Sequence, residues 1–136
     1  RWSWLLLQGR HGYYTRCVTA YRPCKTTANL GSVYNQHLRY WRNKGEFECP
    51  LALFDQQFEE QIQEWLQAGE QLVIGIDANE DIWVGQTAAM MDRLGLQDAV
   101  LSLFPSQSPP ETNLKNDQEI PIDALYVTPG IIPTTA

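Results

Sequence analysis

Asp77 and Asn79 directly follow the most apolar stretch of the chain, residues 72–76. Residues two apart in an extended strand point to the same side, so a carboxylate and an amide are expected to stand together where this stretch ends. The carboxylate can act as a general base for a water nucleophile, and the amide can donate to an attacked phosphate group. The pattern predicts phosphate or metal chemistry. The structural alternative is a β-turn in which Asp and Asn bond their own backbone.

Two further candidate positions lie in predicted strands. Tyr21 and Arg22 precede Pro23, and a phenol beside a guanidinium can bind a phosphate. The alternative here is a core aromatic residue followed by a strand-ending turn. Asp123 falls inside the apolar segment 120–127, where an unpaired carboxylate is costly. It can orient a histidine or reach a metal ion through water, or it faces solvent from an edge strand.

The apolar periodicity predicts the elements that position these residues. Strands are expected at residues 2–8, 13–21, 72–76 and 120–127, the first two as an antiparallel pair and the third buried on both faces. Helices are expected at residues 33–44, after a cap at Ser32, and at residues 50–67 and 87–94. Residues 105–119 are expected to form a polar loop. Strands that alternate with helices predict one α/β domain with a layered, mixed sheet.

The longest expected helix, residues 50–67, is amphipathic. Its apolar stripe comprises Leu51, Phe54, Phe58, Ile62, Trp65 and Leu66. Asp55, Glu59, Glu60 and Glu64 are expected to face water.

Composition narrows the class of protein. No apolar run approaches the roughly 18 residues of a membrane span, and residues 2–7 lack the features of a signal peptide. The three cysteines match no zinc spacing, which predicts reduced thiols in an intracellular protein of the cytoplasm or nucleus.

The charge is distributed unevenly. The net charge is −6, but eight basic against two acidic residues give +6 over residues 1–48, and two against 14 give −12 over residues 49–136. This asymmetry indicates a polyanionic partner such as nucleic acid. Mixing of the two halves on the folded surface is the alternative.

Three motifs in this order resemble the endonuclease/exonuclease/phosphatase superfamily. Residues 18–23, ending Tyr21-Arg22-Pro23, resemble its Tyr-x-Pro strand end. Residues 74–79 resemble its Gly-Asp-x-Asn signature, with Ile76 inserted between Gly and Asp, and residues 122–127 resemble its late Ile-Asp strand. The resemblance spans nearly the whole chain and implies a four-layer α/β/β/α sandwich, of which residues 1–136 form a part. Tyr40-Trp41-Arg42 and the Trp-rich start are more similar to the nuclease domains of retroelements than to repair enzymes.

The resemblance also implies roles for individual residues. Asp77 orients or deprotonates the attacking water, and Asn79 and Tyr21 contact the scissile phosphate. Asp123 holds the catalytic histidine, and Arg22 is a candidate phosphate contact. The cofactor implied is Mg²⁺ or Mn²⁺. The family's metal-binding Asn and Glu precede the Tyr-x-Pro motif and its Ser-Asp-His follows the Ile-Asp strand, so all are expected to lie outside residues 1–136. The fragment alone is therefore expected to be inactive or nearly so.

The leading hypothesis is a metal-dependent nuclease that acts on DNA or RNA in a full-length parent protein. A binding or scaffold domain that has lost its chemistry is the first alternative. A phosphatase that acts on small or lipid phosphates is the second.

Overall fold

The computed structural model describes residues 1–26, 28–105, 112 and 120–134 as a mixed sheet with helices, which confirms the α/β class. The strands are β1 (Trp2–Gln8), β2 (Tyr14–Tyr21), β3 (Gln71–Asp77), β4 (Gln97–Asp98) and β5 (Asp123–Val127). The helices are α1 (Val33–Asn43), α2 (Pro50–Gln67), α3 (Gln86–Arg93) and α4 (Ala99–Leu103), with a 3₁₀ turn, η1, at Arg10–Gly12. The expected loop at residues 105–119 lies almost wholly outside the described residues.

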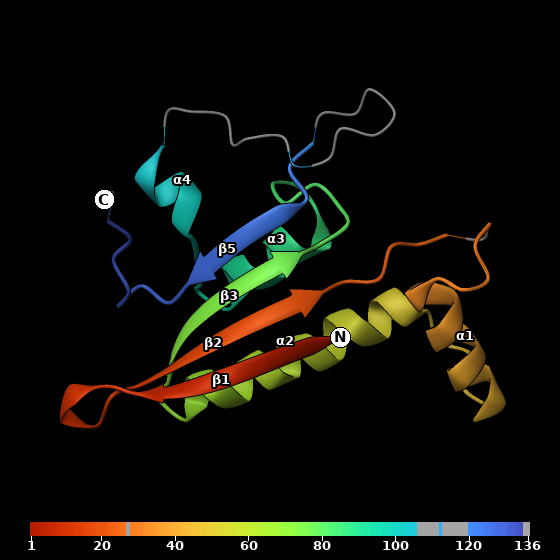
Figure 1. The fold of residues 1–136 in the computed structure, drawn as a ribbon, viewed down its shortest axis with the longest axis horizontal. Coiled ribbons are helices and arrows are strands. Elements are labelled where there is room, and N and C mark those ends of the chain that lie inside the picture. The colour runs from red at the N-terminus through yellow and green to blue at the C-terminus, as the bar shows by residue number, and fades with distance from the viewer. Residues whose placement is uncertain (27, 106–111, 113–119, 135–136) are drawn as a thin grey trace.

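The five strands are ordered β1-β2-β3-β5-β4. β1 and β2 form the expected antiparallel hairpin, and β2 pairs in parallel with β3. β5 is antiparallel to both β3 and β4. Figure 1 shows α2 and α3 behind this sheet, with no described helix on the face turned to the viewer. Among the described residues, no helix is long and apolar enough to span a bilayer.

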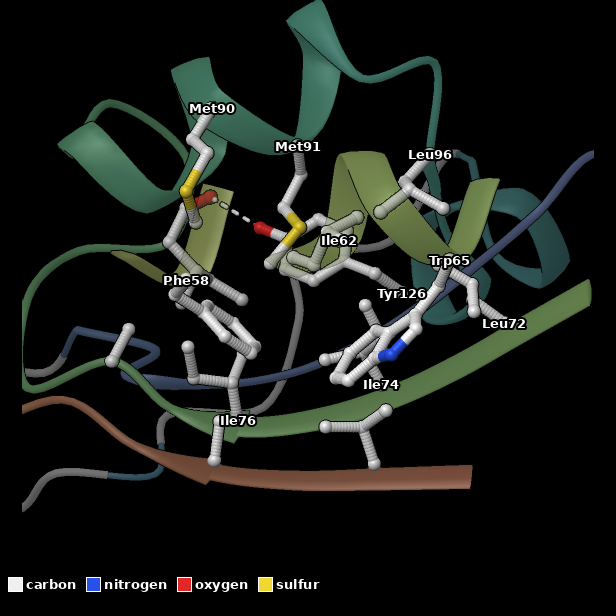
Figure 2. Packing of buried hydrophobic residues seen from close by; sticks show 14 of the residues in the cluster. Phe58, Ile62, Trp65, Leu72, Ile74, Ile76, Met90, Met91, Leu96 and Tyr126 are labelled. Carbon is white, nitrogen blue, oxygen red and sulfur yellow. Dashed lines mark hydrogen bonds between the residues drawn. The ribbon is translucent and has the colours of Figure 1, made fainter. Parts of the chain in front are cut away.

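The core lies between the sheet and helices α2 and α3. Its members include Phe54, Phe58, Ile62 and Trp65 of α2, Leu72, Ile74 and Ile76 of β3, Met90 and Met91 of α3, and Tyr126 of β5. Figure 2 shows the α2 and α3 side chains converging on β3 and Tyr126. The predicted stripe of α2 is confirmed in its central residues, while Leu51 and Leu66 at the two ends are half-buried. Burial of these side chains is the main favourable contribution to folding.

The prediction that residues 72–76 are buried on both faces is wrong. Leu72, Ile74 and Ile76 are buried, but Val73 and Gly75 between them are only half-buried. Alternate residues of a strand face opposite sides, so one side of β3 packs on helices and the other is covered by no described element. This second side, here called the open face, includes Leu5, Leu7, Cys17, Val73 and Leu125 and their polar neighbours. Leu5 pairs with Cys17 and Cys17 with Val73, while Leu125 pairs with Gly75 of the same face.

β5 also begins later than predicted. Pro121 has no N–H to donate to a ladder, and the N–H groups of Ile122 and Asp123 donate to Thr112 Oγ1 at 2.9 and 3.1 Å. The strand therefore starts at Asp123, which is exposed at its first position rather than enclosed within it. The desolvation cost expected for this carboxylate does not arise.

Candidate functional site at the end of the open face

Three candidate residues lie side by side at one end of the sheet. Tyr21 pairs with Asp77 across β2 and β3, and Asp77 pairs with Asp123 across β3 and β5. Residues that pair directly across neighbouring strands point to the same face, and here that is the open face. The sheet thus brings together a phenol and two carboxylates that are separated by 56 and 46 positions in sequence.

Asp77 is the central member of this row and is half-buried. Burial raises the pKa of its carboxyl group, and the charge of Asp123 raises it further, against a hydrogen bond from the Asn79 N–H that lowers it. That N–H lies 3.2 Å from Asp77 Oδ1. A carboxylate whose pKa is moved toward neutrality accepts a proton more readily, which is the property a general base needs.

Asn79 lies at the turn that follows β3. Its φ of 50° is in the left-handed region, which Asn tolerates better than most residues. This turn directs the side chain back toward β2, where Nδ2 donates to the carbonyl of Arg22 at 2.8 Å. The structural alternative therefore holds in part, because Asp77 and Asn79 both bond backbone groups. Asn79 Nδ2 keeps a second hydrogen available for a ligand.

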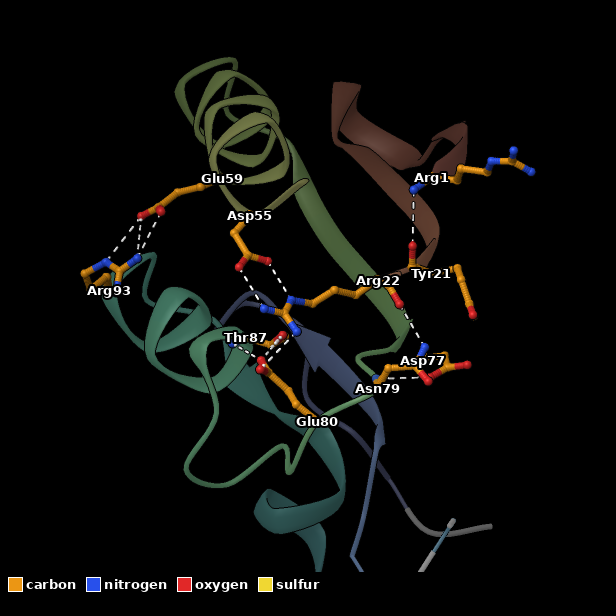
Figure 3. A network of polar contacts seen from close by, with 10 residues as sticks. All are labelled: Arg1, Tyr21, Arg22, Asp55, Glu59, Asp77, Asn79, Glu80, Thr87 and Arg93. Atoms are coloured by element: carbon orange, nitrogen blue, oxygen red, sulfur yellow. Dashed lines mark hydrogen bonds and ion pairs between the residues drawn. The ribbon is translucent and has the colours of Figure 1, made fainter. Parts of the chain in front are cut away.

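Tyr21 is 37% exposed, and its backbone rather than its hydroxyl makes its hydrogen bonds among the described residues. Its N–H donates to the Arg1 carbonyl at 2.8 Å. Figure 3 shows the Tyr21 ring and the Asp77 carboxylate on the same side of the strands, away from α2. The phenol is therefore placed to donate to a ligand that sits over Asp77.

Arg22 does not fit the role of phosphate contact, because its side chain points the opposite way. Its guanidinium is buried and forms a bidentate pair with Asp55 of α2 at 2.7 and 2.9 Å. A third contact, 3.0 Å, joins Arg22 to Glu80. Since Tyr21 faces the open side, its neighbour must face the helices. The prediction that Asp55 faces water is corrected by the same contact.

Glu80 is a structural residue of the site that the sequence analysis missed. Its Oε1 accepts hydrogen bonds from the N–H and the hydroxyl of Thr87 at 2.7 and 2.8 Å, and its Oε2 contacts Arg22. These bonds join the turn after β3 to the first residues of α3 and to β2 (Figure 3). A signal was available in the sequence, since an acidic residue before a helix often satisfies N–H groups of its first turn.

The carboxylates of this row are the candidate ligands for a metal ion. Within the described part of the chain, no three His, Cys, Asp or Glu side chains are close enough together to form a site of their own. Asp77 and Asp123 supply two neighbouring carboxylates, which is the number that Mg²⁺ commonly takes from a protein, with water and substrate phosphate as its other ligands. These two carboxylates supply at most part of a magnesium site, which water and a substrate phosphate would have to complete.

Comparison with known proteins identifies no relative of this chain. No family model matches the chain, and no curated protein sequence matches it. The superfamily assignment therefore stays a prediction that rests on the three motifs.

Proposed function

We propose that the row of Tyr21, Asp77 and Asp123, with Asn79, is part of a site for metal-dependent phosphodiester hydrolysis, most simply a nuclease site. The observation that supports this most directly is the cross-strand register. Three separate motifs could have fallen at different edges of the sheet, and instead they meet on one face at one end. A structural role alone does not require that convergence.

Each side chain has a task in this proposal. Asp77, whose pKa is raised, takes a proton from the attacking water. Tyr21 and the remaining amide hydrogen of Asn79 donate to the phosphate oxygens as negative charge develops on them. Asp123 is the second carboxylate and would orient the catalytic histidine that the resemblance implies. Mg²⁺ or Mn²⁺ bound to the phosphate would supply the Lewis acid that stabilises this charge, and Asp77 would stay off the metal so that it can accept the proton.

The proposal also names a substrate and a cellular compartment. Nucleic acid is the proposed substrate. The three cysteines, all free thiols, are consistent with a reducing compartment, and we place the protein in the cytoplasm or nucleus.

The test is nicking of supercoiled plasmid in Mg²⁺ by a parent protein that carries residues 1–136, with Asp77→Asn compared to wild type. Loss of a general base lowers the rate by about 10²–10⁴-fold. Asp92→Asn is the matched control, because Asp92 is an exposed carboxylate on α3. Residues 1–136 alone are expected to show little cleavage.

Three results would redirect the proposal. If cleavage is the same in wild type and Asp77→Asn, Asp77 has no part in the chemistry. If the wild-type parent releases phosphate from inositol phosphates and leaves plasmid intact, the site belongs to a phosphatase. If neither substrate is hydrolysed, the binding or scaffold alternative is favoured, in which Asp77 and Asn79 serve only the turn that they form.

A further inference from the structure

A second cluster of polar and aromatic side chains lies on α1 and just beyond it. We call it the α1 surface, and it comprises Arg39, Tyr40, Arg42, Lys44 and Phe47. All five are exposed, and α1 itself contains no acidic residue. Glu46 and Glu48 follow it, and a hydrogen bond from the Glu46 N–H to the Trp41 carbonyl keeps Glu46 near the end of the helix.

The basic groups of the α1 surface differ from the arginines that form ion pairs with carboxylates. Arg16, Arg22 and Arg93 each pair with a carboxylate. In the described part of the chain, Arg39, Arg42 and Lys44 form no ion pair. Arg39 donates only to neutral carbonyls, those of Leu30 at 2.9 Å and Asn35 at 3.4 Å. The two halves of the chain thus pair their charges around the sheet, whereas, among the described residues, the three cations of the α1 surface form no ion pair and have only Glu46 and Glu48 as acidic neighbours in sequence.

The aromatic groups are exposed beside these charges. Tyr40 is 52% and Phe47 is 81% exposed, which is unusual for rings that serve only the core. Lys44 Nζ lies 4.7 Å from the centre of the Tyr40 ring, and Trp41 packs edge-on against the same ring at 5.1 Å. These contacts hold Tyr40 in place, as a stacking platform requires.

α1 also contacts the strand end that carries the proposed site. Arg1 Nη2 donates to Gln36 Oε1 of α1 at 3.4 Å, and the Arg1 carbonyl accepts the N–H of Tyr21 at 2.8 Å. Figure 1 shows α1 beyond the end of β2, on the side of the sheet where β2 and β3 terminate. Arg1 therefore joins α1, through its guanidinium, to Tyr21, through its carbonyl.

We propose that the α1 surface binds single-stranded nucleic acid. Arg39, Arg42 and Lys44 contact successive phosphates, and bases stack on Tyr40 and Phe47. Cations that form no ion pair, together with exposed aromatic rings, are the combination that binds single strands without sequence preference. A duplex could contact the cations but not stack on the rings, because its bases are already stacked on one another. The inference rests on the proposed function in one respect only, namely that the bound nucleic acid continues past Arg1 to Tyr21 and Asp77.

The test measures binding of residues 1–136 to a fluorescein-labelled 20-nucleotide oligo(dT) by anisotropy, in EDTA and at several KCl concentrations. The charge variant is Arg42→Gln with Lys44→Gln. The matched control is Arg10→Gln with Arg93→Gln, which also removes two exposed positive charges. We expect the charge variant to bind about tenfold more weakly and its log–log salt slope to fall by about 1.4, at about 0.7 per lost phosphate contact. The control is expected to bind nearly as wild type does.

A ring variant separates stacking from charge. Tyr40→Leu keeps an apolar side chain and is expected to weaken binding by about tenfold, within the range for one stacked base, with the salt slope unchanged. Circular dichroism confirms that each variant is folded.

Three results would overturn the inference. The first is equal loss in the charge variant and its control, which would indicate unspecific attraction. The second is no effect of Tyr40→Leu, which would indicate a polyanion surface without stacking. The third is equal or tighter binding of a 20-base-pair duplex.

The outcome is separable from that of the nuclease proposal. Asp77→Asn is expected to bind the oligonucleotide as wild type does, because Asp77 is not on the α1 surface. Wild-type binding without Asp77-dependent cleavage in the parent would refute the nuclease and leave the α1 surface as a binding site. Asp77-dependent cleavage without α1-dependent binding would refute the α1 surface as a binding site and leave the nuclease proposal standing.

Discussion

The two faces of the sheet differ in burial and in the kinds of side chain they carry, and β3 shows this difference within one strand. Leu72, Ile74 and Ile76 are almost fully enclosed by α2 and α3 (Figure 2). Their neighbours Val73, Gly75 and Asp77 are half-buried on the open face. The packed face carries the stability of the fold. The open face carries the candidate chemistry at its polar end, so the two properties can be changed separately.

Replacement of neighbouring residues of β3 is expected to show the largest difference between the faces. Ile74→Ala leaves a cavity in the core and should cost about 4 kcal/mol in the free energy of unfolding. Val73→Ala, one position away, should cost about 1 kcal/mol because Val73 packs on one side only. Urea denaturation of both variants measures this. Equal costs would mean that the open face is covered when the protein is in solution.

Two arginines that pair with α2 give the next largest contrast. Arg22→Met leaves Asp55 and Glu80 without their cation, and should cost roughly 3 kcal/mol, the lower end for a broken buried pair. Arg93→Met removes a pair with Glu59 at the surface and should cost no more than about 1 kcal/mol. Thermal or urea unfolding separates the two. Similar small values would show that Arg22 does not tie the turn after β3 to α2.

A substitution at Gly85 changes the backbone of the turn after β3 without changing the charge of that turn. A Cβ at this position would lie 2.6 Å from the Asp81 carbonyl oxygen and 2.7 Å from Glu80 Cδ. The backbone must move, so Gly85→Ala should cost about 1–3 kcal/mol. Gln86→Ala, at the exposed next position, is the control and should be nearly neutral. Calorimetry compares them, and a neutral Gly85→Ala would show that the turn adapts.

The fold was largely predictable from sequence where periodicity is strong. α2 has the expected bounds because its apolar residues recur on one face and Pro50 begins it. The Ser32 cap of α1 is also confirmed, since its side chain accepts the Asn35 N–H. The burial of β3 was mispredicted because a continuous apolar run does not distinguish a strand covered on both faces from one covered on a single face.

The site was predictable only as separate motifs. Sequence placed Tyr21, Asp77 and Asp123 near strand ends, but their contact depends on strand order and register, which are properties of the whole sheet. Arg22 was misassigned because adjacency to Tyr21 in sequence suggested a shared ligand. In a strand, adjacent residues face opposite sides, and this one serves the packed face.

Asp77→Asn is expected to have the smallest effect on stability, and its sign is the informative part. Because the pKa of Asp77 is raised in the folded protein, its protonated form favours folding, and that contribution is lost as pH rises through the folded-state pKa. The ionised group therefore opposes folding at pH 7. Asp77→Asn should be more stable than wild type there by about 0.5 kcal/mol. This gain should shrink as pH falls through the raised pKa and vanish well below the ordinary Asp pKa of about 3.9, where both side chains are neutral.

The charge of Asp123 contributes to this shift, so the two residues should be coupled. In an Asp123→Asn background, the gain from Asp77→Asn at pH 7 should be smaller, and a double-mutant cycle of urea denaturation measures the difference. Strict additivity would mean that the carboxylates do not interact across β3 and β5. A carboxylate that lowers the stability of the fold at this position is what a functional role for the open face predicts.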